Sequence, residues 1–325
     1  DVVFLAIESE TEFSSALVGL GVFERSRGTL VAPFPHLVAY TALGNTFLTN
    51  LLVDQACSRD VLTAFFEFLT TQSASWQCIE FLQRSADSRF SRELTEVAGQ
   101  FGMHWIGWEY ERPLLRPRTT TPEQAAAFLS RNRRNRISKS KRQLELIGNV
   151  SLEVIRCGHG MSPYAENFLR LEDIGWKGAV KSSMRSRPET EAFFLEMAEG
   201  FANANRMLFS ELRVDDRVIC TTSNFVAGNA GFGFKFGWDP EFQQNSPGVL
   251  QAVEFAKASH RELHDLDYFD SCSVPDSFIQ TLWPDKRTLT SGAFVSSRIS
   301  KLAVSGMLQL RVLKRKWKNR KASAK

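Results

Sequence analysis

Three β-rich runs decide the fold: MLFSELRV at Met207–Val214, RVICTTSNFV at Arg217–Val226 and GFGFKFGW at Gly231–Trp238. β-Branched and aromatic residues are typical of strands. Asp215 and Asp216 join the first two runs, and Gly228–Ala230 joins the second to the third, so both connections are short turns. The stretch therefore predicts an antiparallel meander of three strands.

The segments on either side extend this pattern. A basic helix is indicated by Thr121 as N-cap, Pro122 in the first turn and Gln124 three residues after the cap, with Gly148 as the stop. Between it and the meander, the sequence predicts a strand and two helices. A helix and a strand follow the meander. The expected ranges are Ser151–Arg156, Pro163–Trp176, Glu189–Asn205, Pro247–His264 and Asp267–Asp270.

The first third of the chain alternates short β-rich runs with helical stretches, which predicts a mixed α/β lobe. Strands are expected at Val2–Ile7, Ala16–Phe23, Thr29–Ala32, Leu37–Leu43, Gln77–Leu82 and His104–Tyr110, and helices at Val61–Thr70 and Ser88–Phe101. Prolines and a Thr-rich segment then indicate a linker. We divide the chain into a first domain (1–115), a linker with the basic helix (116–150), a second domain (151–295) and a C-terminal basic amphipathic helix and tail (296–325). Because Asp1 opens directly into an apolar run, we expect the first domain to be incomplete at its N-terminus.

Particular residues carry a resemblance to a known family. The runs FLRLEDIGWKG (168–178), FKFGWD (234–239) and SPGVL (246–250), in this order after a basic helix, resemble the FemAB-like, CelD-like branch of the GNAT acyltransferases. This resemblance implies tandem GNAT-like α/β domains, each a mixed, mostly antiparallel sheet flanked by helices, with the first domain a degenerate copy. It also implies transfer of an acyl group to an amine, from acyl-CoA such as acetyl-CoA or, in FemAB relatives, from aminoacyl-tRNA. The branch is often tied to exopolysaccharide or cell-envelope synthesis.

The opening of the helix after the meander is a candidate cofactor site. Ser246-Pro247-Gly248 precedes this helix, where free backbone N–H groups and the positive end of the helix dipole favour an anion. The resemblance places the CoA pyrophosphate here and adds Gln244 and Lys235 to the cofactor-binding set. The usual Gln/Arg-x-x-Gly-x-Gly loop is not found; the nearest string, Gly228–Gly233, lies between two strands. A plain helix start is the alternative interpretation.

Strand alternation predicts that Lys235 lies on the face opposite Phe234 and Phe236. Trp176 and Lys177 end the helix that borders the acceptor groove in this fold, and a Lys beside an aromatic ring suits an anionic or sugar-bearing substrate. The resemblance adds Lys286 as a third substrate-binding residue. A packed Trp and a dipole-complementing Lys are the alternative.

Acyl transfer requires a neutral amine and donors for the oxyanion. The candidate catalytic acids are Glu172 and Asp173, one turn before Trp176, and Asp239 after the meander; His159 is a further candidate base. Acids on a solvated helix face explain the first two equally well, and a turn-forming role explains Asp239.

Positive charge is concentrated in two segments. Residues 131–142 hold seven Lys and Arg and residues 311–325 hold eight, while the rest of the chain has 25 of them against 36 Asp and Glu, a net charge of −11. The basic helix lacks interleaved aromatic residues, so only phosphate contacts are indicated, to tRNA, a lipid-linked phosphate or a membrane surface. The chain has no coiled-coil insertion of the kind common in tRNA-using relatives, which weakens the tRNA interpretation. For the tail, contact with anionic lipid and a solubilising role both stay open.

Other classes are disfavoured. Five scattered cysteines without a CxxC pair indicate neither zinc nor a disulfide framework. His260 and His264 do not form an HExxH motif, and neither GxSxG nor a phosphate-binding P-loop is found. Without a run of 18 apolar residues or a signal sequence, we expect a cytoplasmic protein, associated with the inner membrane face if the basic segments bind lipid.

Together these observations predict an N-acyltransferase that uses acyl-CoA and no metal. The acceptor would be an amine of a sugar, an amino acid or an exopolysaccharide or envelope precursor. An aminoacyl-tRNA-dependent ligase and a non-catalytic envelope-polysaccharide synthesis protein are the alternatives.

Overall fold

The computed structural model describes residues 1–11, 14–41, 45–71, 76, 78–158, 160–296, 298 and 300–310. The chain forms two compact units, one made of residues 1–111 and 288–325 and the other of residues 112–287. Two strands, β6 (His104–Leu115) and β12 (Asp285–Val295), run from one unit into the other. The expectations for the basic tail, 311–325, lie outside the described residues.

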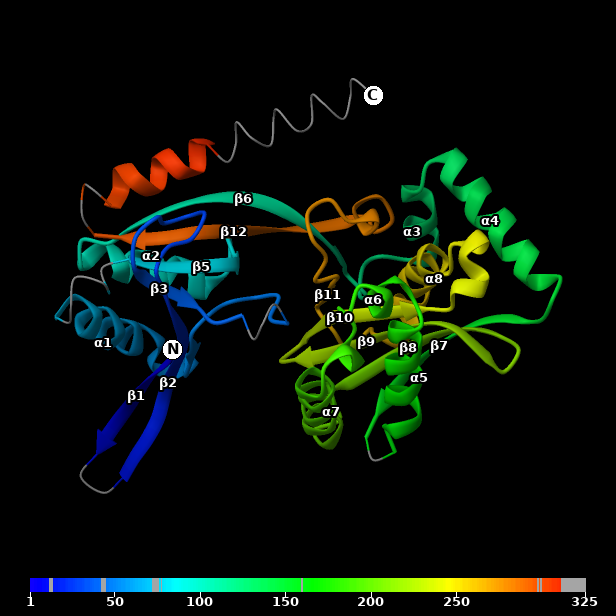
Figure 1. The fold of residues 1–325 in the computed structure, drawn as a ribbon, viewed down its shortest axis with the longest axis horizontal. Coiled ribbons are helices and arrows are strands. Elements are labelled where there is room, and N and C mark those ends of the chain that lie inside the picture. Colours follow the sequence, from blue (N-terminus) through cyan, green and yellow to red (C-terminus); the bar gives the residue numbers. More distant parts are fainter. Residues whose placement is uncertain are drawn as a thin grey trace. The chain divides into compact units, whose positions relative to one another are not determined.

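The first unit is a mixed sheet with α1 and α2 packed against it (Figure 1). Its strands lie in the order β1, β2, β3, β5, β12 and β6, with β4 beside β2. A Phe-rich core joins α1 and α2 to the sheet, with Phe23, Phe65, Phe66, Phe81 and Phe294 all buried. The elements are β1 (Val2–Thr11), β2 (Ser14–Ser26), β3 (His36–Ala39), β4 (Leu52–Val53), α1 (Ser58–Thr71), β5 (Cys78–Ser85) and α2 (Arg89–Gln100).

One expectation for this unit was wrong, and one strand was not predicted. Thr29–Ala32 is a turn, because the Thr29 hydroxyl accepts hydrogen bonds from the N–H groups of Val31 and Ala32, both at 3.1 Å. The sequence reasoning also missed β12, which pairs with β5 although more than 200 residues separate their closest partners in the chain. The described part of the C-terminal helix, residues 300–310, is helical as expected.

The second unit is built around the predicted meander, which is confirmed: β8 is Met207–Val214, β9 is Arg217–Ala227 and β10 is Ala230–Trp238. Its strands lie in the order β11, β10, β9, β8 and β7, antiparallel except for the parallel pair β10 and β11. The other strands are β7 (Val150–Cys157) and β11 (Tyr268–Asp270). The α-helices are α3 (Pro122–Phe128), α4 (Arg131–Glu145), α5 (Ser162–Asp173), α6 (Trp176–Ala179), α7 (Pro188–Asn203) and α8 (Pro247–Glu262).

Alternation along the strands gives this sheet two apolar faces. Leu208 and Leu212 of β8 belong to the core under α8, whereas Met207 and Phe209 belong to the core under α5 and α7. Figure 1 shows α5 and α7 covering one face. We call the two sides the α5 face and the α8 face.

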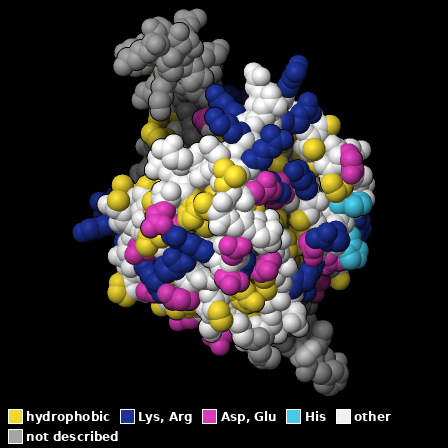
Figure 2. Space-filling view, turned by 90° about the vertical axis from the view of Figure 1, so that its right-hand side faces the viewer, with side chains coloured by type: hydrophobic (Ala, Val, Ile, Leu, Met, Phe, Trp, Pro, Cys, Tyr) yellow, Lys and Arg dark blue, Asp and Glu magenta, His cyan; other side chains and the backbone are white. Residues whose placement is uncertain are grey.

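The predicted basic helix is in fact two helices. The capping box of Thr121 and Gln124 opens α3 as expected, but Leu129 is extended and Ser130 caps a new helix, α4, by accepting from the Arg133 N–H. The helix predicted at Pro163–Trp176 likewise ends at Asp173, and Trp176 begins the short α6. Figure 2 shows Lys and Arg side chains gathered over α4.

The mixed α/β fold class, with mostly antiparallel sheet flanked by helices, is confirmed. Among the residues that the structure describes, no helix is both long enough and apolar enough to cross a membrane.

Candidate functional site

The central feature of the second unit is a fork between β10 and β11. The two strands pair only at Ala230, Gly231 and Phe232, and β10 then continues to Trp238 beside β9. At Gly233 a Cβ atom would lie 3.0 Å from the Ser271 carbonyl oxygen, so glycine permits the chain after β11 to pass this closely. The pairing between the two strands ends at Phe232 and Asp270.

A pocket opens at this fork. Gly233 and Lys235 of β10 border it together with Ser271 after β11, and Gly248 borders it from the start of α8. Its cavity volume is about 80 Å³, smaller than the roughly 150 Å³ cavity that takes a benzene ring. Its walls are mainly aromatic and come from β10, α8, β11 and the segment after β11: Phe236, Phe255, Phe269, Phe278 and Trp283.

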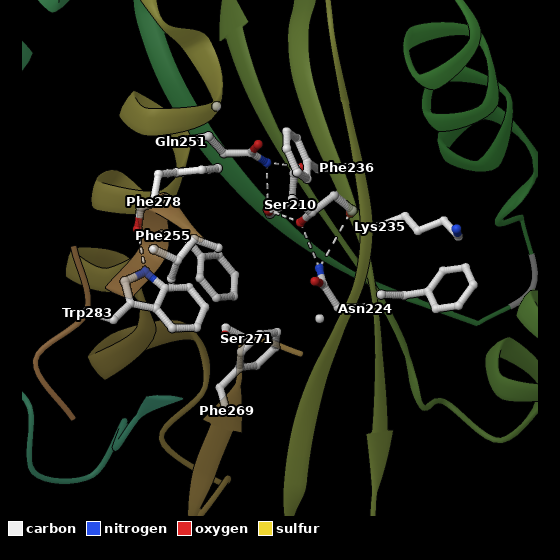
Figure 3. A pocket seen from close by; sticks show the side chains of 16 residues that line it. Ser210, Asn224, Lys235, Phe236, Gln251, Phe255, Phe269, Ser271, Phe278 and Trp283 are labelled. Carbon is white, nitrogen blue, oxygen red and sulfur yellow. Dashed lines mark hydrogen bonds between the residues drawn. The ribbon is translucent and has the colours of Figure 1, made fainter. Parts of the chain in front are cut away.

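The floor of the pocket is a polar network (Figure 3). The Ser210 hydroxyl lies 2.7 Å from the Thr222 hydroxyl and accepts from Gln251 Nε2 at 2.9 Å. Asn224 Nδ2 donates to the Thr222 hydroxyl at 2.9 Å. The sequence reasoning missed these residues. Polar side chains at alternate positions of an otherwise apolar strand, Thr222 and Asn224, were the available signal.

The predicted orientation of Lys235 was wrong with respect to Phe234. The register between β10 and β9 shifts between Gly233 and Lys235, a β-bulge that interrupts the alternation. Lys235 and Phe234 consequently lie on the same face, with the Lys235 Nζ 5.5 Å from the centre of the Phe234 ring, while Phe236 lies on the other. Figure 3 shows the Lys235 amino group pointing away from the aromatic wall of the pocket. Burial lowers the pKa of Lys235.

On the α5 face, Glu172 and Lys177 form a buried ion pair. Lys177 Nζ lies 3.0 Å from Glu172 Oε1 and donates to the Phe236 carbonyl oxygen at 2.8 Å. The Met184 N–H donates to Glu172 Oε2 at 2.8 Å, so both oxygens of this carboxylate accept hydrogen bonds. The solvated position that we considered for Glu172 is contradicted, because the residue is 1% exposed.

The remaining predicted acids have structural partners. Asp173 accepts a hydrogen bond from the Ser183 hydroxyl at 2.6 Å. Asp239 caps the 3₁₀ helix Pro240–Asn245 by accepting from the Glu241 N–H at 3.1 Å, and it pairs with Arg217 at 2.7 Å. His159 lies outside the described residues. These contacts leave the catalytic roles of Asp173 and Asp239 as predictions.

The three predicted substrate-binding residues occupy different positions. Trp176 begins α6 and is 58% exposed. Lys177 is tied to Glu172 and β10, as described above. Lys286 lies on β12 with an exposed side chain and does not line the pocket.

The residues predicted to bind the cofactor, Ser246, Pro247 and Gly248, form the start of α8, and their role stays a prediction. Ser246 has a φ of 49°, a left-handed conformation that favours glycine, and its side chain makes no capping hydrogen bond. Pro247 is buried in the first turn, and the N–H of Gly248 has no intrahelical acceptor at this position. Gln244 is exposed in the preceding 3₁₀ helix.

The segment before α8 is close in sequence to the glycine-rich loop, although the complete motif is absent. Gly228–Gly233 forms a turn and the start of β10. Residues 243–248, QQNSPG, stand at the start of α8 and differ from Gln-x-x-Gly-x-Gly only by Ser246, which adopts a backbone conformation typical of glycine.

No group of three or more His, Cys, Asp or Glu that could hold a metal ion is found in the part of the chain that the structure describes. The ring nitrogens Nδ1 of His260 and His264 contact the carbonyl oxygens of Pro117 and Arg261. All five cysteines are free.

Comparisons with known proteins agree with this architecture. Residues 131–273 match the family model described as acetyltransferase (GNAT) domain. The fold resembles the C-terminal domain (DUF2156) of a protein assigned as a lysylphosphatidylglycerol synthetase from Agrobacterium fabrum (TM-score 0.55, 11% identity, 95% of this chain and 88% of that chain).

It also resembles FemX (TM-score 0.51, 10% identity, 93% of this chain and 90% of that chain). A third similar structure is a conserved protein of unknown function from Bacteroides thetaiotaomicron (TM-score 0.51, 11% identity, 85% and 83%). No curated protein matches the sequence. Residues 131–273 therefore form an acetyltransferase (GNAT) domain, in a chain whose overall fold resembles that of FemX.

Proposed function

We propose that the protein is an N-acyltransferase that takes an acyl group from acyl-CoA at the fork between β10 and β11. The observation that carries this proposal is the early divergence of these strands, because β10 keeps an edge along which an extended amide-containing arm could bind. The fork also leads to the start of α8, where the Gly248 N–H and the helix dipole favour a pyrophosphate.

The acyl group would occupy the pocket on the α8 face. Its aromatic walls suit an apolar group, and its volume of about 80 Å³ suits a short chain. Ser210, Thr222 and Gln251 also line the pocket. Ser210 forms hydrogen bonds with both Thr222 and Gln251, so these polar groups have partners within the protein.

The acceptor amine would approach from the α5 face, between β10 and the segment that carries Trp176. The amine nitrogen attacks the thioester carbonyl, the C–S bond breaks and CoA leaves as the thiolate, while the nitrogen loses one proton. Lys235 is the candidate group to receive this proton, because its amino group lies on this face beside Phe234 and burial lowers its pKa. Backbone N–H groups of β10 would stabilise the oxyanion.

We assign Glu172 to positioning. Glu172 Oε1 accepts a hydrogen bond from Lys177, which also donates to the Phe236 carbonyl oxygen. Glu172 Oε2 accepts from the Met184 N–H and so fixes the segment at Met184. The acceptor class is an amine on a sugar, an amino acid or an envelope precursor, with Trp176 as its exposed aromatic contact.

A second candidate is transfer from an aminoacyl ester such as aminoacyl-tRNA. It is favoured by the fold shared over most of the chain with FemX and with the lysylphosphatidylglycerol synthetase domain, whose name indicates aminoacyl transfer to a lipid. In this case the polar floor of the pocket would receive the amino group of the donor.

Ligand-induced stabilisation tests the two candidates. The protein is heated with CoA, acetyl-CoA or a non-hydrolysable aminoacyl-adenosine amide, and a ligand at 100 times its Kd is expected to add about 2.7 kcal/mol. In Gly248→Glu the new side chain occupies the anion position, whereas the Cβ meets Phe236 only at ordinary contact distance, so the fold should persist. Gly200→Glu on exposed α7, where a Cβ meets nothing within 4 Å, is the matched control.

Stabilisation by CoA that Gly248→Glu removes and Gly200→Glu retains would support the acyl-CoA proposal. Stabilisation by the aminoacyl compound alone would transfer the proposal to the second candidate. If no compound stabilises the folded protein, both are wrong.

A further inference from the structure

The outer surface of α4 carries a stripe of positive charge that the transferase site does not use. Ile137 and Leu144 are the buried residues of this helix. By helical periodicity Arg131, Lys139 and Arg142 lie on the opposite side, and all three are exposed. Figure 2 shows the gathering of Lys and Arg over this helix.

Within the described part of the domain, only the inward-facing bases of α4 have side-chain partners. Lys141 pairs with Glu254 of α8 at 3.2 Å, and Arg133 donates to the Thr281 hydroxyl. Among the described residues, no carboxylate forms an ion pair with the five other bases, Arg131, Arg134, Arg136, Lys139 and Arg142. These charges are therefore available to an anionic partner.

The position of these charges argues against a purely solubilising role. The first turn of α4 contains no acid and several arginines, although the positive end of the helix dipole disfavours cations there. Such an arrangement lowers the stability of the helix. A solvated helix face would gain stability from the opposite charge pattern, so a binding role accounts better for the basic residues.

Exposed aliphatic side chains adjoin the stripe. Leu146, at the C-terminal end of α4, is 85% exposed and lines the same shallow groove as Lys139 and Arg142. Ile147 beside it is 62% exposed. Transfer of such exposed apolar side chains from water to a nonpolar phase lowers their free energy.

We propose that α4 docks on the surface of an anionic lipid bilayer. Its bases would contact headgroup phosphates while Leu146 and Ile147 enter the interface, which is the pattern of an in-plane membrane helix. RNA would use the charges but not the aliphatic pair, and the bases of α4 are not interleaved with aromatic residues for base stacking. The Asn245 side chain donates to Ser140 and Gln143 of α4, so docking would bring the start of α8 close to the bilayer.

Vesicle binding tests the proposal with the full chain. Wild-type protein is sedimented with vesicles of phosphatidylcholine alone or with 30 mol% phosphatidylglycerol added, at low and high salt. Each base near an anionic surface contributes about 1 kcal/mol, or about fivefold in affinity, so Arg131→Gln/Lys139→Gln/Arg142→Gln should weaken binding about 100-fold. Arg89→Gln/Arg206→Gln/Arg261→Gln removes the same charge from exposed positions elsewhere and should weaken it less than tenfold.

An environment-sensitive fluorophore on Leu146→Cys, with Cys57→Ser to remove the least buried native thiol, reports insertion. Its emission should shift to the blue with anionic vesicles, whereas the same probe on Gly200→Cys should not respond. The proposal is overturned if the α4 variant binds vesicles as well as wild type, if both triple variants lose affinity equally, or if the Leu146 probe stays in water. Binding of bulk tRNA without binding of vesicles would assign α4 to RNA instead.

Discussion

Lys177 and Glu172 form a buried ion pair, with Nζ 3.0 Å from Oε1, that links α5 and α6 to the Phe236 carbonyl of β10. Removing the base leaves the carboxylate buried with the Met184 N–H as its remaining partner. Breaking a buried pair costs about 3–5 kcal/mol, so Lys177→Met should lower the free energy of unfolding by about this amount. Urea denaturation of Lys177→Met, Glu172→Gln and the double variant measures the coupling; a loss below 1 kcal/mol would contradict a structural role for the pair.

Gly237 permits α5 to cross β10 closely. A Cβ at this position would lie 2.3 Å from the Glu172 nitrogen, a contact with backbone that no side-chain movement relieves. Gly237→Ala should therefore destabilise the protein by about 1–3 kcal/mol or more. In Gly200→Ala, where the new Cβ meets nothing, better helix propensity should add about 0.5–1 kcal/mol. Equal thermal shifts in the two variants would refute this account of the crossing.

Lys235 gives a pH-dependent prediction. Burial lowers its pKa below the ordinary value of 10.5, so the unfolded chain binds this proton more tightly than the folded protein. The resulting penalty is fully present below the folded pKa and disappears as the pH rises toward 10.5. Lys235→Met should therefore be more stable than wild type at pH 7, and the difference should shrink by pH 10. Lys139→Met, at an exposed site, should show no such trend in denaturation curves at the two pH values.

Asp239 can be tested for separate capping and catalytic roles. Asp239→Ala removes the hydrogen bond from the Glu241 N–H and should lower the free energy of unfolding by about 0.5–2 kcal/mol. Loss of the ion pair with the half-exposed Arg217 should add little to this cost. Asp239→Ser keeps a capping oxygen and should retain most of this stability. If Asp239→Ser is stable and active, the residue acts as a cap; if it is stable and inactive, the predicted catalytic role is supported.

The pocket should limit the length of the acyl group. Ala252 lines it from α8, and Ala252→Leu would fill part of a cavity of about 80 Å³. We expect this variant to lose binding of butyryl-CoA more than of acetyl-CoA in calorimetric titrations. Ala258→Leu, also half-buried on α8 but outside the pocket, is the control. Equal losses for both acyl chains would show that the group does not enter this pocket.

The local elements of the second unit could be predicted from short-range signals in the sequence. Strand composition and two short turns predicted the meander at Met207–Trp238, and the capping box at Thr121 and the Pro at 122 predicted the start of α3. These signals depend on neighbours within a few residues, so they can be read without the fold. The element order and the runs around Trp176, Trp238 and Ser246 also indicated the acyltransferase family, which the match over 131–273 supports.

How these elements pack against one another could not be predicted from local sequence. The β-bulge before Lys235 turned its amino group to the α5 face, and the partner register of β8 and β9 brought Ser210 to Thr222. Glu172 became buried because Gly237 lets α5 approach β10, and β12 formed because β5, far away in the chain, accepts it. Such features depend on contacts between residues distant in the sequence, and these contacts form only when the sheet forms. A register shift of one residue moves the following side chains to the other face of the sheet, so local alternation then predicts the wrong face.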